Sequence, residues 1–587
     1  MDQSLSLFQG KDKPDHIIGW QLYEHGMDFK RSMRVFDNVR VNENFYIGKQ
    51  WEGVDSGGLP TPQINILKRV VGFIVATITS DNIHCQASAF SNTVGTSGYK
   101  DLVNIVNDEF EAITEQNRLP ALVREFARNA AVDGDGCMYT YWDADAETGQ
   151  EAKGRVKTEI VENTRVVFGD PNDRSVQSQS WIILSKREPA RRTRRRAKNN
   201  GVKDWRMIRS DDEGREAEDS AKYTDGNCTV CQLFWKAEED ISGFCKEGDV
   251  CCYEFTMDAS VREAWNTGLK LYPFTWLSWD YVQDSYHGQA MITGLIPNQV
   301  FINKSWAMTM LSMMKNAYSK VIYDASRIKR WDNRIGSAIG INGGDVNSVA
   351  RVIDPPPISP QVSQYIQLAV EQTEQSLGAT SVALGDTRPD NTSAIIALQR
   401  AAATPSEMTK QNIYNAIEEQ YRIYLDFMGE YYGERYVDVP PTSQEIAAVQ
   451  FAQQMNPDLE VPEEVPMLFD FSILQSHPVI IKLDVGGSTY YSQIASMTTL
   501  DNLLMKGQID IVDYLERVPD DYIPNRRALI EKKRNQLQMQ QQMQMPGMAP
   551  PPDGGVAPPE KPDITAGRGY GAIQRAINQT GDTKGIV

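Results

Sequence analysis

Apolar residues recur every three or four positions in the middle of the chain, over residues 297–317. The recurring residues are Ile302, Trp306, Met310, Met313 and Ala317. This spacing is the period of an amphipathic helix, which presents one apolar stripe to a neighbour. Pro297 comes just before the stripe, and a first helical turn tolerates proline because its missing N–H has no helical partner there. The pattern therefore predicts a helix whose first turn contains Pro297.

A second helix of the same kind follows after a polar segment. Ser359 is a suitable N-cap, Pro360 a suitable first residue and Gly378 a suitable end for this helix. Its apolar stripe consists of Val362, Ile366, Ala369, Val370, Thr373 and Leu377. Between the two helices, residues 320–323 and 350–353 are short apolar runs bounded by turn residues, which predicts two short strands.

A short polar loop and a much longer helix come next. The loop consists of Leu384, Gly385, Asp386, Thr387, Arg388, Pro389, Asp390 and Asn391. The helix is predicted from Thr392 to Tyr432, with Pro405 in its interior. An internal proline removes one backbone hydrogen bond and clashes with the preceding turn, so we expect a kink at Pro405.

The first 286 residues change from helical to β-type patterning. Residues 1–30 are polar and are expected to be loosely held, and a helix is predicted over residues 29–45. Residues 101–132 carry two amphipathic stripes that are broken near Pro120. From Gly136 onward, short β-type runs are separated by charged or Gly-containing turns, which predicts a mainly antiparallel sheet domain.

The C-terminal part returns to helix after further β-type sequence at residues 436–439 and 469–485. Helices are predicted over residues 490–505, 509–517 and 525–543. From Pro546 onward the chain is rich in Pro and Gly and has too few apolar residues to bury a core. We therefore expect a disordered tail over residues 546–587.

Length and charge restrict the possible classes of function. The 587 residues are enough for several domains, and the formal net charge is −18. This negative net charge argues against a protein that binds nucleic acid over its whole surface, because affinity for phosphate comes from Lys and Arg. It is compatible with a protein that lets DNA pass along an acidic wall.

No apolar run reaches the roughly 18 residues of a membrane span, and the first residues lack the basic and apolar regions of a signal peptide.

Two clusters of distinctive residues each have competing interpretations. The basic run Lys186–Lys198 is either a nucleic-acid patch or a solvated helix or loop that pairs with the acidic residues 211–219. The second interpretation is favoured, because clustered charge is usually a solvated face. Cys228 and Cys231 have zinc-ligand spacing, but no second pair with that spacing and no histidine follows before Cys252. Buried thiols in a sheet are the favoured interpretation of Cys228, Cys231, Cys245, Cys251 and Cys252.

No catalytic signature is recognisable. The chain has five histidines, none of which has metal-ligand spacing with another, and it lacks both a nucleophile elbow and a Walker sequence. We therefore expect a non-enzymatic protein that uses no cofactor and no metal. Two alternatives are a zinc-binding α+β enzyme of unknown reaction and a scaffold or adaptor protein that forms no ring.

The order of helix, polar excursion, helix, loop and kinked helix resembles the portal proteins of tailed double-stranded-DNA bacteriophages, the head–tail connectors. The segments Asn44-Phe-Tyr-Ile-Gly-Lys-Gln-Trp51 and Pro62-Gln-Ile-Asn-Ile-Leu-Lys-Arg-Val-Val71 are similar to the start of many portal chains. The resemblance covers roughly residues 30–540 and lies in the order of its elements, not in one motif. It implies an α+β fold with a mixed α/β wing, a two-helix stem, a small α/β clip, a long kinked helix with a tunnel loop, and a helical crown.

The resemblance also implies where the parts of the chain begin and end. The N-terminal arm and the first part of the wing would be residues 1–286, and the tail would be residues 546–587. The parts between them would be the first stem helix 287–318, the clip 319–358, the second stem helix 359–379, the tunnel loop 380–391, the kinked helix with the second part of the wing 392–486, and the crown 487–545.

Roles for single residues follow from the same resemblance. The loop Leu384–Asn391 would project towards DNA, where Arg388, flanked by Asp386 and Asp390, offers one phosphate contact per subunit. Pro405 would mark the helix kink. Stem packing would involve Ile302, Trp306, Met310, Met313 and Met314.

The resemblance further implies an assembly and a set of partners. A ring of about twelve copies would occupy one vertex of the capsid in the virion, after assembly in the bacterial host cytoplasm. Double-stranded DNA would pass through the ring during genome packaging and ejection. Expected partners are the terminase large subunit, the major capsid protein, a scaffolding protein, and head-completion adaptor and tail proteins, with no membrane involved.

Overall fold

The structure is a computed structural model of the chain, with a mixed α+β fold in two compact units, Met1–Gln493 and Ile494–Val587. The residues that it describes are 15–79, 83–89, 97–211, 226–316, 320–332, 339–343, 345–353, 360–375, 407–439, 465–476, 479–485, 500–506, 508–518, 529–530 and 533.

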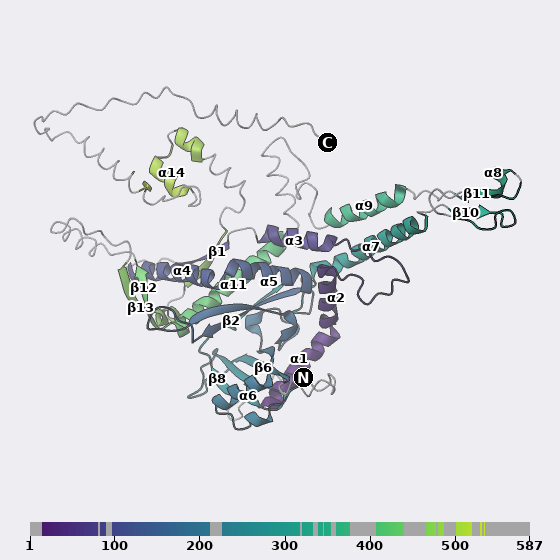
Figure 1. Cartoon of the computed structure of the whole chain (residues 1–587). Helices are drawn as coiled ribbons and strands as arrows, with labels where there is room; N and C mark the ends of the chain where they lie inside the picture. Colours follow the sequence, from purple (N-terminus) through teal and green to yellow (C-terminus); the bar gives the residue numbers. More distant parts are fainter. Residues whose placement is uncertain are drawn as a thin grey trace, which may run out of the picture. The chain divides into compact units, whose positions relative to one another are not determined.

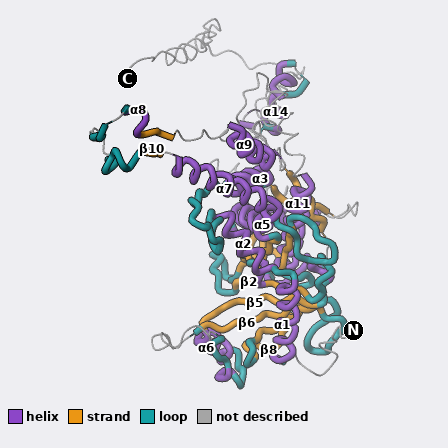
Figure 2. Tube along the Cα trace, turned by 90° about the vertical axis from the view of Figure 1, so that its right-hand side faces the viewer, coloured by secondary structure: helices purple, strands orange, loops and turns teal. Residues whose placement is uncertain are grey.

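The largest sheet of the first unit has five antiparallel strands in the order β4-β5-β6-β7-β8. Its strands are β4 Val166–Phe168, β5 Trp181–Pro189, β6 Asn227–Lys236, β7 Val250–Phe255 and β8 Ser260–Asn266. Figure 2 shows helices α1 (His16–Ser32) and α6 (Ala190–Asn199) beside these strands. Helix α1 approaches the sheet closely, because a Cβ at Gly19 would meet the Phe255 ring and a Cβ at Gly26 would meet Val167. The β-type runs after Gly136 are thus confirmed as antiparallel strands.

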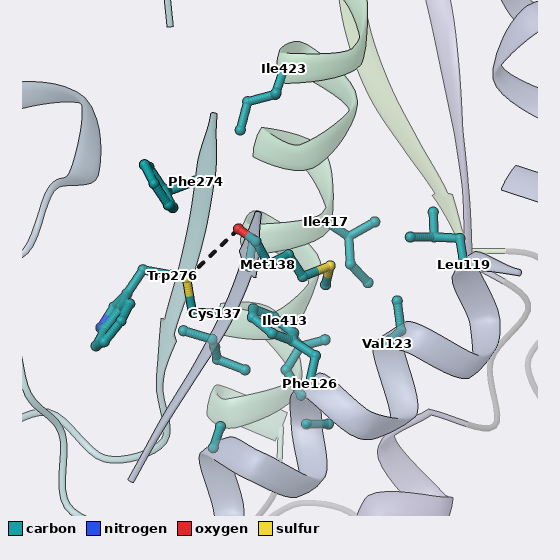
Figure 3. Packing of buried hydrophobic residues seen from close by; sticks show 14 of the residues in the cluster. Leu119, Val123, Phe126, Cys137, Met138, Phe274, Trp276, Ile413, Ile417 and Ile423 are labelled. Atoms are coloured by element: carbon teal, nitrogen blue, oxygen red, sulfur yellow. Dashed lines mark hydrogen bonds between the residues drawn. The ribbon is translucent and has the colours of Figure 1, made fainter. Parts of the chain in front are cut away.

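A second sheet has the order β3-β2-β9, with β2 Asp135–Asp143, β3 Arg155–Val161 and β9 Phe274–Ser278. Helices α5 (Leu119–Asp133) and α11 (Glu407–Tyr431) contribute to the same buried core. In Figure 3, Phe126 of α5, Met138 of β2 and Ile413 of α11 meet in this core. The core therefore joins segments that are far apart in the chain.

Two further strand pairs bring together distant parts of the chain. Strand β1 (Ile83–Ala89) pairs antiparallel with β14 (Val479–Val485), and β12 (Glu434–Val439) pairs with β13 (Val465–Asp470). Helices α3 (Ile66–Ile78) and α4 (Ser97–Asn117) belong to the same core. The short elements of this unit are η1 Asn163–Arg165, η2 Val176–Ser178, η3 Trp205–Met207 and η5 Phe471–Gln475.

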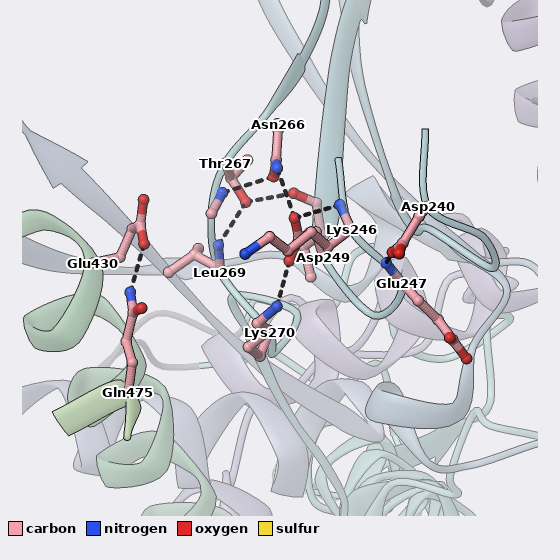
Figure 4. Close-up of polar contacts among 12 residues, drawn as sticks. Asp240, Lys246, Glu247, Asp249, Asn266, Thr267, Leu269, Lys270, Glu430 and Gln475 are labelled. Atoms are coloured by element: carbon pink, nitrogen blue, oxygen red, sulfur yellow. Dashed lines mark hydrogen bonds and ion pairs between the residues drawn. The ribbon is translucent and has the colours of Figure 1, made fainter. Parts of the chain in front are cut away.

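Polar contacts hold the loops beside the five-stranded sheet (Figure 4). Asp249 accepts hydrogen bonds from the side chains of Asn266 and Lys270 and from the backbone N–H of Lys246. Burial favours a higher pKa for Asp249, but these donors outweigh it and hold the pKa below its usual value. The backbone N–H of Lys270 donates to Asp426 of α11 at 2.8 Å. The ionised Asp249 therefore fixes the loop between β8 and β9, and this loop contacts α11 through Asp426.

The N-terminal helices differ from what the sequence predicts. Residues 1–30 were expected to be loosely held, but residues 16–30 belong to α1, which packs against the sheet. The single helix expected over residues 29–45 is replaced by α1 and α2 (Val35–Ile47), separated at Arg34, whose φ of 54° is left-handed. Periodicity missed this break because a left-handed residue usually is Gly or Asn, and Arg34 carries no such signal. The helical pair predicted over residues 101–132 is confirmed as α4 and α5.

The second unit contains helix α14 (Ile511–Arg517), which confirms the helix predicted over residues 509–517. Its N-cap is Asp510, whose carboxylate accepts from the backbone N–H of Ile511 at 2.7 Å. Residues 500–505 are also helical, and the Tyr514 hydroxyl bonds to the Asp501 carboxylate at 2.7 Å. The remainder of the helices predicted over residues 490–505 and 525–543 lies mostly outside the described residues.

Candidate assembly surface on two helices

Helices α7 (Met291–Asn316) and α9 (Pro360–Gln375) pack side by side (Figure 1). Between them in the chain lie strands β10 (Lys320–Tyr323) and β11 (Ala350–Ile353), which pair antiparallel, with the one-turn helix α8 (Val346–Val349) just before β11. These bounds confirm both strands predicted in this segment and the predicted start of the second helix. A helix pair with a small strand pair inserted between its members is therefore built from local sequence signals.

The position of Pro297 within its helix differs from the one that the sequence predicted. Helix α7 begins at Met291, so Pro297 lies inside the helix and not in its first turn. The two preceding turns are held by burial: Ile292 is fully buried, and Met291 and Leu295 are nearly so. Burial of these side chains outweighs the backbone hydrogen bond that the proline removes.

Buried amide side chains attach α7 to the N-terminal segment. Asn303 donates to the Oε1 of Gln50 at 2.6 Å, and Gln299 donates to the backbone oxygen of Ile64 at 2.6 Å. Gln299 also donates to Asn303 at 2.9 Å, and its own oxygen accepts from the N–H of Ile66 at 3.2 Å. Gln50, Gln299 and Asn303 are each at most 5% exposed. No sequence pattern predicted this network, although Gln50 lies in a segment that carries the family resemblance.

Polar contacts also attach α9. Asn298 of α7 donates to the hydroxyl of the buried Thr373 at 3.2 Å. Arg69 of α3 pairs with Glu374 at 3.4 Å. Polar contacts thus add to apolar packing in positioning both helices, and part of their apolar surface stays uncovered.

The uncovered surface of the pair is rich in large apolar side chains. On α7, Met308 is 60% and Met314 is 65% exposed, and on α9 Tyr365 is 66% exposed. The further exposed members on these helices are Phe301, Met313, Val362 and Leu368. We call this set of seven side chains the stem surface. A concentration of exposed large apolar side chains on one helix pair favours contact with other protein surfaces.

The residues predicted for stem packing divide between the buried and the exposed sides. Ile302 is fully buried within its own chain, Trp306 packs against the core while half-exposed, and Met310 is half-buried. Met313 and Met314 belong to the stem surface. The loop Leu384–Asn391 and Pro405 lie outside the described residues.

A buried charged cluster lies where the chain enters α7. The Lys30 ammonium of α1 has no exposed surface and donates to the backbone oxygens of Asn163, at 2.7 Å, and Val166. Asp135 accepts from the Nδ1 of His287 at 2.7 Å and from the N–H of Gly288 at 2.8 Å. Burial lowers the pKa of Lys30 to about 7 and also lowers the pKa of His287, and Asp135 opposes both shifts. The cluster connects α1, β2 and the segment before α7.

The cysteines do not converge as the zinc interpretation requires. Cys228 and Cys231 are three residues apart on β6, so their side chains point to opposite faces of the sheet, into two separate apolar clusters. Burial raises the pKa of Cys228 and of Cys251, which disfavours the thiolate that binds zinc. Within the part of the chain that is described, no three His, Cys, Asp or Glu side chains are placed to hold a metal ion. The geometry supports the interpretation as buried thiols.

Comparison with known families agrees with this architecture. The model of the phage P22-like portal protein family matches residues 21–458, which is well over half of the chain. The chain therefore belongs to the P22-like portal protein family of bacteriophages. No curated protein matches it.

Membership of this family has several direct consequences. The family is structural and not enzymatic, and its members are components of the phage capsid that associate with copies of themselves and with assembly partners. Among the helices that the structure describes, none has the length and apolar character needed to cross a membrane.

Proposed function

We propose that the chain forms a closed ring of about twelve copies at one vertex of the capsid, and that DNA is packaged and ejected through its channel. The observation that carries this proposal is the stem surface. Its seven apolar side chains are exposed in one chain, although α7 is anchored by buried amides and α9 is bonded to α7 through Thr373. Burial of one large apolar side chain contributes roughly 1.5–3 kcal/mol, so the surface favours contact with a second copy.

The parts of the chain take portal roles in this proposal. Helices α7 and α9 form the stem, β10 and β11 belong to the clip, and the five-stranded sheet belongs to the wing. Residues 487–545 form the crown. The loop Leu384–Asn391 faces the channel, next to a helix that is kinked at Pro405. Because Arg388 offers a single, salt-screened contact per subunit, DNA can touch this loop without being held by it.

The proposed partners follow from the same roles. The clip is the docking platform of the terminase large subunit during packaging, and of head-completion adaptors and tail proteins afterwards. The wing contacts the major capsid protein and the scaffolding protein during assembly in the host cytoplasm. The following experiment also tests the alternative that the chain is a scaffold or adaptor protein that forms no ring.

The test replaces exposed members of the stem surface and measures the mass of the assembly. Trp306 is unsuitable because it also packs within its own chain. Met314→Asp combined with Tyr365→Asp changes two side chains that are 65% and 66% exposed, so the single chain should fold normally. In a ring, however, each buried, unpaired carboxylate costs several kcal/mol. We expect monomers or small oligomers by mass photometry and particle imaging, with unchanged circular dichroism.

Met408→Asp is the control for one introduced carboxylate, because Met408 is 81% exposed and lies on α11, outside the stem surface. This variant should form rings like the wild type. Rings of wild-type mass from the double variant would show that the stem surface does not mediate assembly. Absence of rings from the wild type would contradict the proposed ring itself.

A further inference from the structure

A strongly basic region lies at one end of the five-stranded sheet, in a chain whose net charge is −18. Residues 186–209 contain eleven Lys and Arg side chains and only two acidic ones. They comprise the end of β5, all of α6 and the turn η3 (Trp205–Met207). The wing as a whole is proposed above to contact capsid and scaffolding proteins, but none of those roles uses this basic region in particular.

Helix α6 separates its residues sharply into a buried and a basic face. Ala190, Thr193 and Ala197 are fully buried against the sheet, at the three- and four-residue spacing of one helix face. The opposite face is exposed and consists of Arg191, Arg192, Arg195, Lys198 and Asn199. This exposed face contains no apolar side chain.

Two arginines on the flanks of the helix hold it in place. Arg196 pairs with Glu188 at 3.1 Å and with Glu254 at 3.5 Å, and both carboxylates are nearly buried. The Nε of Arg194 donates to the backbone oxygen of Ile208 at 2.8 Å. Glu188 and Glu254 are therefore engaged by an arginine that lies outside the exposed face.

The turn after α6 extends the basic surface. Trp205 has the Lys198 ammonium 5.5 Å and the Arg206 guanidinium 5.1 Å from its ring centroid. Cation–π contacts of this kind restrict the positions of both charged groups. Lys203 and Arg209 are exposed on the same turn. We call the exposed basic residues of α6 and this turn the basic surface.

We propose that the basic surface binds the phosphate backbone of double-stranded nucleic acid, without reading its sequence. From Arg192 to Lys198 the helix rises by about 9 Å, so several cations can reach successive phosphates of one duplex, which carries a charge every ~1.7 Å of axis. Guanidinium groups also match phosphate geometry through paired N–H donors. A docking site for a protein would instead centre on apolar or aromatic anchors, and the exposed face of α6 has none. On the adjoining turn Met207 is 53% exposed, while the half-buried Trp205 lies against two cations, so this surface is predominantly cationic.

The experiment measures binding of the full chain to a labelled duplex of arbitrary sequence by fluorescence anisotropy, from about 50 to about 200 mM salt. The test variant combines Arg192→Gln, Arg195→Gln and Lys198→Gln, which are all on the exposed face and spare the pairs of Arg196 and Arg194. We expect at least a tenfold rise in Kd at the lowest salt. The slope of log K against log salt should fall by about 0.9 for each phosphate that is no longer neutralised, or about 2.7 in total.

Two further variants separate a local site from general charge and from misfolding. Arg124→Gln, Lys153→Gln and Lys246→Gln remove the same charge from exposed residues elsewhere and should leave Kd nearly unchanged. Arg192→Lys with Arg195→Lys keeps the charge and should retain most of the salt dependence. Mass photometry of the same samples reports ring formation independently, because this binding does not depend on the proposed channel.

Several results would overturn the proposal. One is the absence of duplex binding by the wild type at the lowest salt, and another is wild-type affinity and slope in the test variant. An equal rise of Kd in the charge-matched control would show that net charge, and not this surface, is responsible. Displacement of the duplex by poly-glutamate at equal charge concentration, with tighter binding of the peptide, would assign the surface to an acidic protein.

Discussion

Lys30 is a basic residue without exposed surface, although lysine usually keeps its ammonium group in water. Its ammonium donates to the backbone oxygens of Asn163 and Val166. Burial nevertheless lowers the pKa of Lys30 to about 7, more than Asp135 raises it. The residue thus joins α1 to the sheet at an electrostatic cost that depends on pH.

This cost predicts how stability changes with pH. In the unfolded chain Lys30 titrates near 10.5, and in the folded chain near 7, so between these values the unfolded state binds more protons. The contribution of Lys30 to the free energy of unfolding therefore rises with pH across this window and is constant below it. Lys30→Met removes that contribution. We expect the wild type to gain stability relative to Lys30→Met between about pH 7 and 10.5, measured as urea unfolding by tryptophan fluorescence.

Lys246→Met at an exposed position is the control. The free energy of unfolding of this variant, plotted against pH, should run parallel to that of the wild type over the same range. If the free energies of unfolding of Lys30→Met and the wild type also run parallel against pH, Lys30 titrates normally in the folded protein. The informative quantity is the difference between variant and wild type in the free energy of unfolding, because the other titrating groups are present in both proteins.

At the scale of the element, helix α7 depends on buried amides as much as on apolar packing. Asn303 bonds to both Gln50 and Gln299, and it is only 4% exposed. Asn303→Ala would leave the Oε1 of Gln50 without this donor in a buried position. An unsatisfied buried polar group costs about 1–3 kcal/mol, so we expect a loss of that size in the free energy of unfolding.

Asn298→Ala on the same helix is the comparison, because Asn298 is exposed and makes one longer bond, to Thr373. Its substitution should cost less than about 1 kcal/mol. Equal losses for the two variants would show that the amide network adds nothing beyond the average hydrogen bond.

At the scale of the whole molecule, the loop Leu384–Asn391 should affect DNA passage and not folding. Its polar, Gly- and Pro-containing composition predicts little burial, so polar substitutions should change stability by less than about 0.5 kcal/mol. Arg388→Glu would place a negative charge opposite the DNA phosphates in every subunit of the ring. Rings should form normally, while the genome content of particles with the mutant protein should fall.

Shortening the loop should also reduce packaging or retention of DNA. Wild-type DNA content in particles of both variants would assign the constriction of the channel to another part of the chain.

The segment after Met545 should be dispensable for assembly. Residues 546–587 are rich in Pro and Gly and carry too few apolar side chains for a core. Truncation after Met545 should leave rings of correspondingly smaller mass, and limited proteolysis should remove this segment early from the full chain. Failure of the truncated chain to form rings would show that the tail makes assembly contacts.

The sequence by itself determined the local elements of the protein. Strands β10 and β11, the start of α9 and the break between α4 and α5 were predicted because periodicity, caps and turn residues act over a few neighbouring positions. The order of these elements was also enough to indicate the family. The loop Leu384–Asn391 and the kink at Pro405 remain predictions, since they lie outside the described residues.

Only the tertiary structure decided which distant segments meet. The pairing of β1 with β14 brings Ser88 to Ile480, 392 positions away, and the contact of Gln50 with Asn303 spans 253 positions. Neither leaves a local signal, because an amide or a short apolar run is compatible with many partners. Burial likewise decided two of the local errors, since apolar side chains before Pro297 carry α7 through the proline and packing on the sheet orders α1. The physical reason is the same in each case: the free energy of burial depends on what lies across the core and not on the adjacent residues.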